Sequence, residues 1–557
     1  MGAKQTVLEK RGFTVVKQEM NEVLVRSKEG HVYTVREIRN ADDIFVVNEI
    51  LQKLEHPHIV GHQQSFTEGD TLYVLTDHHE DRSLFQKVDA QGKLGQPFSE
   101  EQILDWIVEI CMALKHLHDN SVVHKDLRPQ NVFFTEFGSV CLGEVQEIKD
   151  RAGPDSGADG DVSNIPPELL SGDVYHDKSD IWLLGCLTYL LCMLKWPFTA
   201  ESTIKLIPKI LNAEYPALPD SLSPDLGDII REALQVKPED RPSAKDILCK
   251  PGVIRILAEK SVATVEDLQS SVIKLRALAD GLEKFHYGAT IGSLTGGVVG
   301  VVGGITSIVG LILAPVTLGA SLIVTGVGVG VAVAGGATAG ISNITNMVNQ
   351  SSDRQSIKNI VREFEEKMNS VVKSLQYISE GLQALENVGS FSDGAHPSAR
   401  LRNAVNVGCR LGRGLGAIPE LVRLLQVVNL GKVAAQAARI AEVATGILSA
   451  FFVAVDIFFI AVDAKEIHNI KQSRAPQSSD DSSKLELLNP ENMAEEQPGS
   501  EERNTEVKSA TMKFVLKVRE TADQLQDSVD ELSDIIKLIP KIRCFQDIGD
   551  AFAPPHQ

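Results

Sequence analysis

Residues 124–131 bring together side chains that can take part in acid–base and metal chemistry. The run reads His-Lys-Asp-Leu-Arg-Pro-Gln-Asn. A carboxylate such as Asp126 can accept a proton, and the carboxamide oxygen of Asn131 can hold a divalent cation. Such groups act only where the surrounding elements hold them in place. The flanking sequence therefore decides what this run can do.

Short apolar runs separated by polar breaks precede this segment, a pattern typical of β-strands. They lie at residues 13–16, 23–25, 32–35 and 72–75, with one helical pattern near 45–54. From Ser99, which with Gln102 forms a helix-capping pattern, apolar residues recur at helical spacing: Ile103, Ile107, Ile110, Leu114 and Leu117. The sequence predicts a small β-rich lobe followed by a larger helical lobe.

This outline resembles a protein kinase. Residues 124–131 resemble the catalytic loop, with Asp126 at the base position and Asn131 at a magnesium position. Residues 33–38 resemble the strand that carries the ATP lysine, here Arg36, and Glu49 fits its helix partner. The phrases LEHPHIV, ALKHLHD and KSDIWLLGC are similar to the NIMA-related (Nek) serine/threonine kinases. The resemblance covers about residues 10–250 and includes the later signatures at 167–168, 180–185 and 240–242.

The departures from the kinase pattern fall on the chemistry. The phosphate-loop glycines correspond to Val16, Gln18 and Asn21, whose side chains obstruct close approach of the backbone to phosphate. Arg36 replaces a lysine, and Glu144 stands where the kinase pattern has the magnesium aspartate. We therefore expect a pseudokinase that requires no ATP or Mg²⁺. The alternative is an active, membrane-anchored serine/threonine kinase that binds them at Arg36, Glu49, Asn131 and Glu144.

A second feature is a long stretch without charge. No Asp, Glu, Lys, Arg or His occurs from Tyr287 to Ser352, and Pro315 divides the stretch into two halves. Each half exceeds the roughly 20 residues that a helix needs to cross a bilayer, and lipid cannot satisfy exposed backbone groups. We expect a transmembrane-type helical hairpin over residues 287–341. A hairpin buried in a soluble helical bundle is the alternative.

Glycines in this hairpin recur once per helical turn, which allows close packing of two helices. They are Gly288, Gly292, Gly296, Gly300 and Gly304 in the first half, and Gly326 and Gly330 in the second.

Amphipathic helices flank the hairpin. Thr264 is expected to cap a helix with apolar residues Val265, Leu268, Val272, Leu275, Ala279 and Leu282. A second helix carries Ile357, Ile360, Val361, Phe364, Met368, Val371, Leu375, Ile378 and Leu382. Residues 401–440 combine basic and apolar side chains, which suits either an anionic membrane surface or a solvated face.

A third apolar run covers residues 446–462 and contains Asp456. An ionisable group there is a candidate acid sensor in lipid, or a paired group in a bundle core. The composition of residues 471–507 predicts a disordered linker. Residues 508–540 follow as an amphipathic helix with a heptad pattern that suits a short coiled coil.

The C-terminal half resembles the apolipoprotein L family over about residues 260–540. The similarity lies in the glycine-rich run from Thr290 with its turn at residues 313–317, in GILSAFFVAVDIFFIAVDAKEIH, and in TMKFVLKVRETADQLQDSVDEL. This resemblance implies lipid or lipoprotein binding, membrane insertion favoured by acid and, in some members, pores. Secreted members carry a signal sequence, which is not seen here, so an extracellular location follows only from the family resemblance.

Composition limits the remaining classes. The net charge of −20 disfavours nucleic acid as a partner. The seven cysteines show no CxxC spacing, so neither a zinc site nor a disulfide framework is indicated, and a reducing cytosol fits. The start Met-Gly-Ala-Lys-Gln-Thr fits N-myristoylation at Gly2. We expect an intracellular, membrane-associated protein.

These observations predict a bilobal α+β kinase-like domain at residues 1–257, followed by an all-α, membrane-active domain at 258–470. The linker 471–507 and the terminal helix 508–540 complete the chain. Lipid or membrane is the expected partner of the second domain. The kinase-like surface and the C-terminal helix are expected to bind protein.

Overall fold

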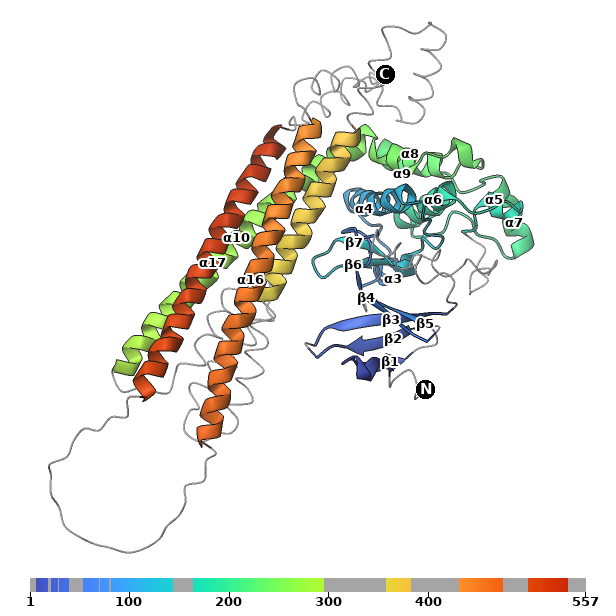
Figure 1. Cartoon of the computed structure of the whole chain (residues 1–557). Helices are drawn as coiled ribbons and strands as arrows, with labels where there is room; N and C mark the ends of the chain where they lie inside the picture. Colours follow the sequence, from blue (N-terminus) through green and yellow to red (C-terminus); the bar gives the residue numbers. More distant parts are fainter. Residues whose placement is uncertain are drawn as a thin grey trace, which may run out of the picture. The chain divides into compact units, whose positions relative to one another are not determined.

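The computed structural model describes residues 7–18, 22–28, 30–39, 54–69, 71–79, 82–143, 164–294, 357–381, 430–473 and 499–538 (Figure 1). They belong to two compact units. The kinase-like unit comprises Met1–Ser261, Lys373–Ala434 and Ile539–Gln557, and the helical unit comprises Val262–Val372 and Ala435–Leu538.

The kinase-like unit begins with a five-stranded antiparallel sheet in the order β1-β2-β3-β5-β4. The strands are β1 (Thr14–Gln18), β2 (Glu22–Arg26), β3 (Val32–Arg39), β4 (His62–Glu68) and β5 (Thr71–Asp77). Val35 lies opposite Val23 on one side and Leu75 on the other, so apolar side chains from three strands meet. They form a core with Leu8 and Phe66. The predicted β-rich lobe is present.

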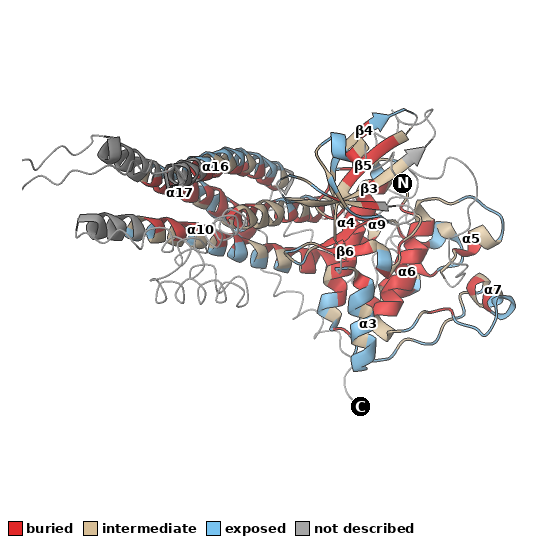
Figure 2. Ribbon diagram, turned by 90° about the horizontal axis from the view of Figure 1, so that it is seen from below, coloured by how far each residue is buried: buried red, intermediate tan, exposed pale blue. Residues whose placement is uncertain are grey.

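The helical lobe surrounds α4 (Glu100–Asp119), whose predicted apolar residues Ile103, Ile107, Ile110, Leu114 and Leu117 are all buried. Ser99 caps it by accepting a hydrogen bond from the backbone of Gln102, as expected. Figure 2 shows buried residues along much of α4 and α6. The other elements are α3 (Leu84–Leu94), η2 (Pro129–Asn131), β6 (Val132–Phe134), β7 (Val140–Leu142), α5 (Pro167–Leu170), α6 (Asp177–Met193), α7 (Thr203–Leu211), α8 (Pro224–Ala233), η4 (Pro238–Asp240) and α9 (Ala244–Leu248).

The helical unit contains parts of α10 (Pro251–Leu294), of the helix at residues 357–381 and of α16 (Leu430–Ser473), and all of α17 (Gly499–Leu538). The predicted apolar positions on α10 and at residues 357–378 are buried. Those on α17 are also buried: Val515, Val518, Ala522, Leu525, Val529, Leu532 and Ile536. Phe514 stacks on Phe458 at 4.2 Å between ring centroids, and Arg519 pairs with Asp280 at 2.7 Å. The heptad face of α17 therefore packs against helices of its own chain.

The sequence interpretation needs two corrections here. Thr264 does not cap a helix, because α10 begins at Pro251 and continues through it. Ile254 and Leu257 keep this earlier turn buried, and nothing before Thr264 interrupts the helix. Helices cover both ends of the linker predicted at residues 471–507, because α16 continues to Ser473 and α17 begins at Gly499.

Most of the expected hairpin lies outside the described residues. Gly288 and Gly292 are in the last turns of α10. Gly296, Gly300, Gly304, Pro315, Gly326 and Gly330 fall outside the described part, as do residues 401–429 of the basic stretch.

Candidate functional site

The kinase-like catalytic loop is held around Asp126, whose carboxylate is bound on both oxygens. Arg128 Nε lies 2.8 Å from Asp126 Oδ1, and its terminal nitrogen donates to Oδ2 at 2.9 Å. Asn131 Nδ2 donates to the same Oδ2 at 2.6 Å and to the Asp126 carbonyl at 3.0 Å. Asp126 and Asn131, the two site residues predicted in this loop, are therefore in direct contact.

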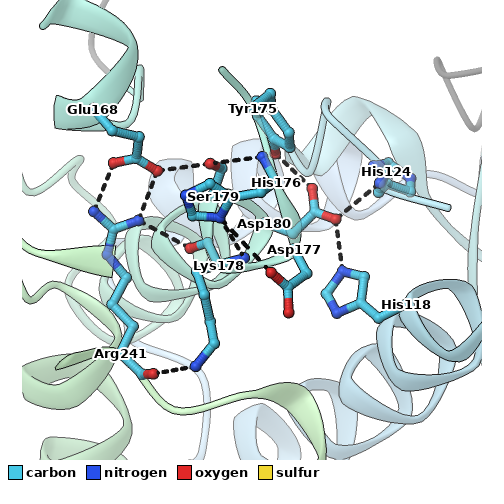
Figure 3. Close-up of polar contacts among 10 residues, drawn as sticks. All are labelled: His118, His124, Glu168, Tyr175, His176, Asp177, Lys178, Ser179, Asp180 and Arg241. Atoms are coloured by element: carbon cyan, nitrogen blue, oxygen red, sulfur yellow. Dashed lines mark hydrogen bonds and ion pairs between the residues drawn. The ribbon is translucent and has the colours of Figure 1, made fainter. Parts of the chain in front are cut away.

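Behind the loop, the buried Asp180 of α6 holds its backbone (Figure 3). The amides of His124 and Lys125 donate to its two carboxylate oxygens at 2.8 and 2.9 Å. His118 lies 2.8 Å from Oδ2, and the Tyr175 hydroxyl also donates to Asp180. Lys125 adopts a φ of 66°, a left-handed conformation that these hydrogen bonds help to stabilise. Burial alone would raise the pKa of Asp180, but the hydrogen bonds and charge of His118 outweigh it and lower the pKa.

A second buried pair joins α5 to the segment before α9 (Figure 3). The Arg241 guanidinium donates to both oxygens of Glu168, at 2.9 and 2.7 Å, and both side chains are almost fully buried. Ser179 donates to Glu168 at 2.6 Å. Arg241 also donates to backbone carbonyls, including Gln235 at 2.7 Å. This pair fixes the loops around the site and touches none of the loop residues 124–131 that are expected to react.

The remaining predicted site residues are only partly described. Arg36 is half-buried in β3, opposite Glu22 on β2 and Val74 on β5. Val16 lies at an irregularity of β1 and is exposed. Glu49, Glu144 and Asn21 fall outside the described residues.

The loop agrees only in part with a nucleotide–magnesium site. Asn131 turns its amide nitrogen to Asp126, which leaves Oδ1 as the atom that would take a cation. However, the Arg128 guanidinium lies against the Asp126 carboxylate. In the described part of the chain, no three His, Cys, Asp or Glu side chains are grouped to hold a metal ion.

Sequence reasoning missed several partners. His118 and Tyr175 bind Asp180. His118 lies in the phrase ALKHLHD, but that phrase did not indicate its role. Tyr377 was also missed, although it is buried between the predicted core positions Leu375 and Ile378. The one indication of this contact in the sequence was a large aromatic residue, Tyr377, outside the predicted apolar stripe of its helix.

Comparison with known proteins agrees with this division of the chain. Residues 14–252 match the protein kinase domain model, and residues 263–478 match the apolipoprotein L model. The chain joins a protein kinase domain to an apolipoprotein L domain.

Similar curated proteins include serine/threonine-protein kinases Nek1 and Nek3 of Mus musculus and Nek5 of Homo sapiens. The match to Nek1 is 37% identical over 239 residues, which are 41% of this chain and 20% of Nek1. The match to Nek3 is 37% identical over 204 residues, 36% of this chain and 40% of Nek3. The match to Nek5 is 34% identical over 206 residues, 36% of this chain and 29% of Nek5. The chain thus spans well under half the length of these relatives.

The apolipoprotein L domain contains a second candidate site on α16. Within the described residues, Lys432–Ala461 is the one helix long and apolar enough to cross a membrane by length and composition, with a mean hydropathy of 2.3. Val453, Ile457 and Ile460 lie on one face of it, exposed by 59%, 63% and 60%. We call these three residues the α16 stripe. Beside them, Asp456 Oδ1 lies 2.9 Å from Lys358 Nζ, so the candidate acid sensor is ion-paired within this unit.

Proposed function

We propose that the kinase domain of this chain is a pseudokinase that serves as a docking or regulatory module. The observation that supports this most directly is the ion pair of Arg128 with Asp126, in which a terminal guanidinium nitrogen donates to Oδ2 at 2.9 Å and Nε lies 2.8 Å from Oδ1. A base held in this way would have to exchange the guanidinium for the substrate hydroxyl before it could accept a proton. Arg36 and Glu144 add two further departures at positions that would bind ATP and Mg²⁺.

Reversing the departures at Arg36 and Glu144 and shortening the Arg128 contact with Asp126 tests this proposal. The triple variant Arg36→Lys, Arg128→Lys, Glu144→Asp should gain phosphate transfer that the parent chain lacks. The same triple variant with Asp126→Asn added is the matched control. Equal transfer by the parent chain and the triple variant, abolished by Asp126→Asn in both, would show that the parent is already an active kinase.

The second part of the proposed function is lipid or membrane binding by the apolipoprotein L domain. The α16 stripe supports it, because three exposed β-branched residues on one face of a long apolar helix are suited to contact with acyl chains. We propose an intracellular, membrane-associated protein in which N-myristoylation at Gly2 adds a second anchor. Lipoprotein binding is the corresponding role outside the cell. Protein partners would bind the kinase domain and α17.

Vesicle flotation of the full chain tests lipid binding by the α16 stripe. Full burial of an isoleucine side chain contributes roughly 1.5–3 kcal/mol. The double variant Ile457→Ser, Ile460→Ser should therefore lose at least about tenfold in affinity for phosphatidylcholine–phosphatidylserine vesicles. Leu516→Ser on α17 is the control, because Leu516 is equally exposed at 59% but lies off the stripe. Equal flotation of both variants would reject the stripe as the contact.

A further inference from the structure

Tyr377 packs against the kinase domain although it belongs to the sequence that matches apolipoprotein L. Only 5% of the residue is exposed. Its hydroxyl donates to the carbonyl of Met112 on α4 at 3.2 Å and lies 3.4 Å from His56 Nε2. The Lys115 ammonium lies 5.3 Å from its ring centroid. Tyr377 is thus anchored at the junction of α4 and the loop that contains His56.

The residues after Tyr377 extend this contact. Glu380 Oε2 lies 3.2 Å from Lys115 Nζ, which also binds Asp119 at 2.6 Å. Gly381 fits closely, since a Cβ there would stand 3.1 Å from Ile254 Cδ1 and 3.4 Å from the Cα of Cys249. Residues 373–381 therefore belong to the same compact unit as the kinase domain.

The hydrogen bonds of His56 depend on its being neutral. The amide of His58 donates to His56 Nδ1 at 3.1 Å, so Nδ1 carries no proton. The ring proton of neutral His56 is then on Nε2, which faces the Tyr377 oxygen, while Tyr377 donates onward to Met112. A second proton on Nδ1 would point at the His58 amide and break this hydrogen bond.

The charged groups around His56 also oppose a second proton. On its own loop lies His58, with ring centroids 5.6 Å apart, and on α4 lie Lys115 and His116, the latter stacked at 4.9 Å. Lys373 faces it from the docked segment. The neighbouring carboxylates, Glu380 and Asp119, are both bound to Lys115. Burial first, and then the electrostatic effects of His58, His116, Lys373 and Lys115, lower the pKa of His56 far below its ordinary value.

We propose that residues 373–381 are an intramolecular docking segment for the kinase domain, bound while His56 is neutral and released when His56 is protonated. The receiving surface consists of His56, Met112, Lys115, Cys249 and Ile254. Through this contact, a change in the apolipoprotein L domain would reach α4 and the loop at residues 54–60. The inference does not depend on whether the kinase domain transfers phosphate.

Proton linkage gives the size of the effect. A solvent-exposed histidine titrates near about 6.5, whereas docked His56 stays neutral, so the docked state binds fewer protons. Docking is therefore favoured above about pH 6.5 and weakens as the pH falls below it. For one proton, the docking equilibrium should weaken by up to roughly tenfold between pH 7.4 and 5.5. This is an upper limit, because His58, His116 and Lys115 remain around His56 after release.

Hydrogen–deuterium exchange of the full chain tests the proposal. After correction for intrinsic exchange rates, the opening equilibrium of residues 373–381 should rise by up to roughly tenfold from pH 7.4 to 5.5. His56→Gln keeps an N–H donor toward Tyr377 but cannot gain charge, so its opening should not change with pH. His31→Gln removes a histidine from another part of the unit and should keep the rise.

A cross-link provides an independent measurement. Gly381→Cys would place its Cβ 3.4 Å from the Cα of Cys249, so the two cysteines would be neighbours while the segment is docked. The oxidised variant should show no pH-dependent opening, and the reduced variant should show it. A wild-type opening that ignores pH would overturn the proposal. An unchanged rise in His56→Gln, or in the cross-linked variant, would overturn it as well.

Discussion

The buried pair of Glu168 and Arg241 offers a quantitative prediction. Glu168→Gln keeps the shape of the side chain but leaves the Arg241 guanidinium, fully buried, without its counter-charge. Breaking such a pair by removing one partner costs about 3–5 kcal/mol. For a unit of this size, each kcal/mol lowers Tm by roughly 2–4 °C. We therefore expect Tm to fall by on the order of 10 °C.

Tryptophan fluorescence measures this unit selectively, because Trp106, Trp182 and Trp196 all lie in the kinase domain. Glu201→Gln is the matched control. It breaks an exposed ion pair with Lys205 and should leave Tm nearly unchanged. Equal shifts in the two variants would refute the assignment of stability to the buried pair.

The loss of Tm caused by Glu168→Gln should depend on pH. Burial by itself would raise the pKa of Glu168, but hydrogen bonds from Arg241 and Ser179 outweigh it and lower the pKa below the ordinary value of 4.5. Because the folded state holds the carboxylate ionised, its contribution is complete above about pH 4.5 and is lost as the pH falls further. The Tm difference between wild type and Glu168→Gln should narrow in acid.

Three further predictions concern packing and lipid. Gly185→Ala should destabilise the kinase domain by about 1–3 kcal/mol in fluorescence-detected unfolding, because the new Cβ would stand 2.8 Å from the Cβ of Ala233. Gly92→Ala, in open space on α3, should be neutral or slightly stabilising, and equal effects of the two variants would contradict this prediction. We expect vesicle insertion of the wild type to rise as the pH falls from neutral to about pH 5. Asp456→Asn removes the partner of Lys358 and should move this rise toward neutral pH, whereas alkali-resistant flotation that is equal in both proteins at every pH would count against the prediction. Gly296→Leu with Gly300→Leu should reduce membrane retention or stability by separating the predicted hairpin helices, and unchanged behaviour would argue against close packing there.

Periodic patterns and local motifs were predictable from the sequence. The predicted apolar positions of α4, α10, α17 and residues 357–378 are buried, because the apolar face of a helix must pack against another element. The helical spacing of apolar residues is enough to identify such a face from the sequence. The contact between Asp126 and Asn131 follows from their neighbouring positions in one loop.

Contacts between distant segments could not be predicted in the same way. Tyr377 meets His56 and Met112 only after the chain has folded, and no local pattern encodes that pairing. The start of α10 was misplaced because a suitable cap at Thr264 does not stop a helix that is already buried upstream. Composition likewise could not distinguish a polar helix end at Gly499 from a linker.

The most direct test of the pseudokinase proposal is transfer of γ-phosphate from ATP by the full chain, measured beside its Asp126→Asn variant. The assay should include Mg²⁺ and a generic basic protein substrate, and should score autophosphorylation as well. We predict that incorporation by wild type does not exceed that of Asp126→Asn. Nucleotide binding without transfer would agree with this account. Turnover by wild type that disappears in Asp126→Asn would contradict it and establish an active kinase.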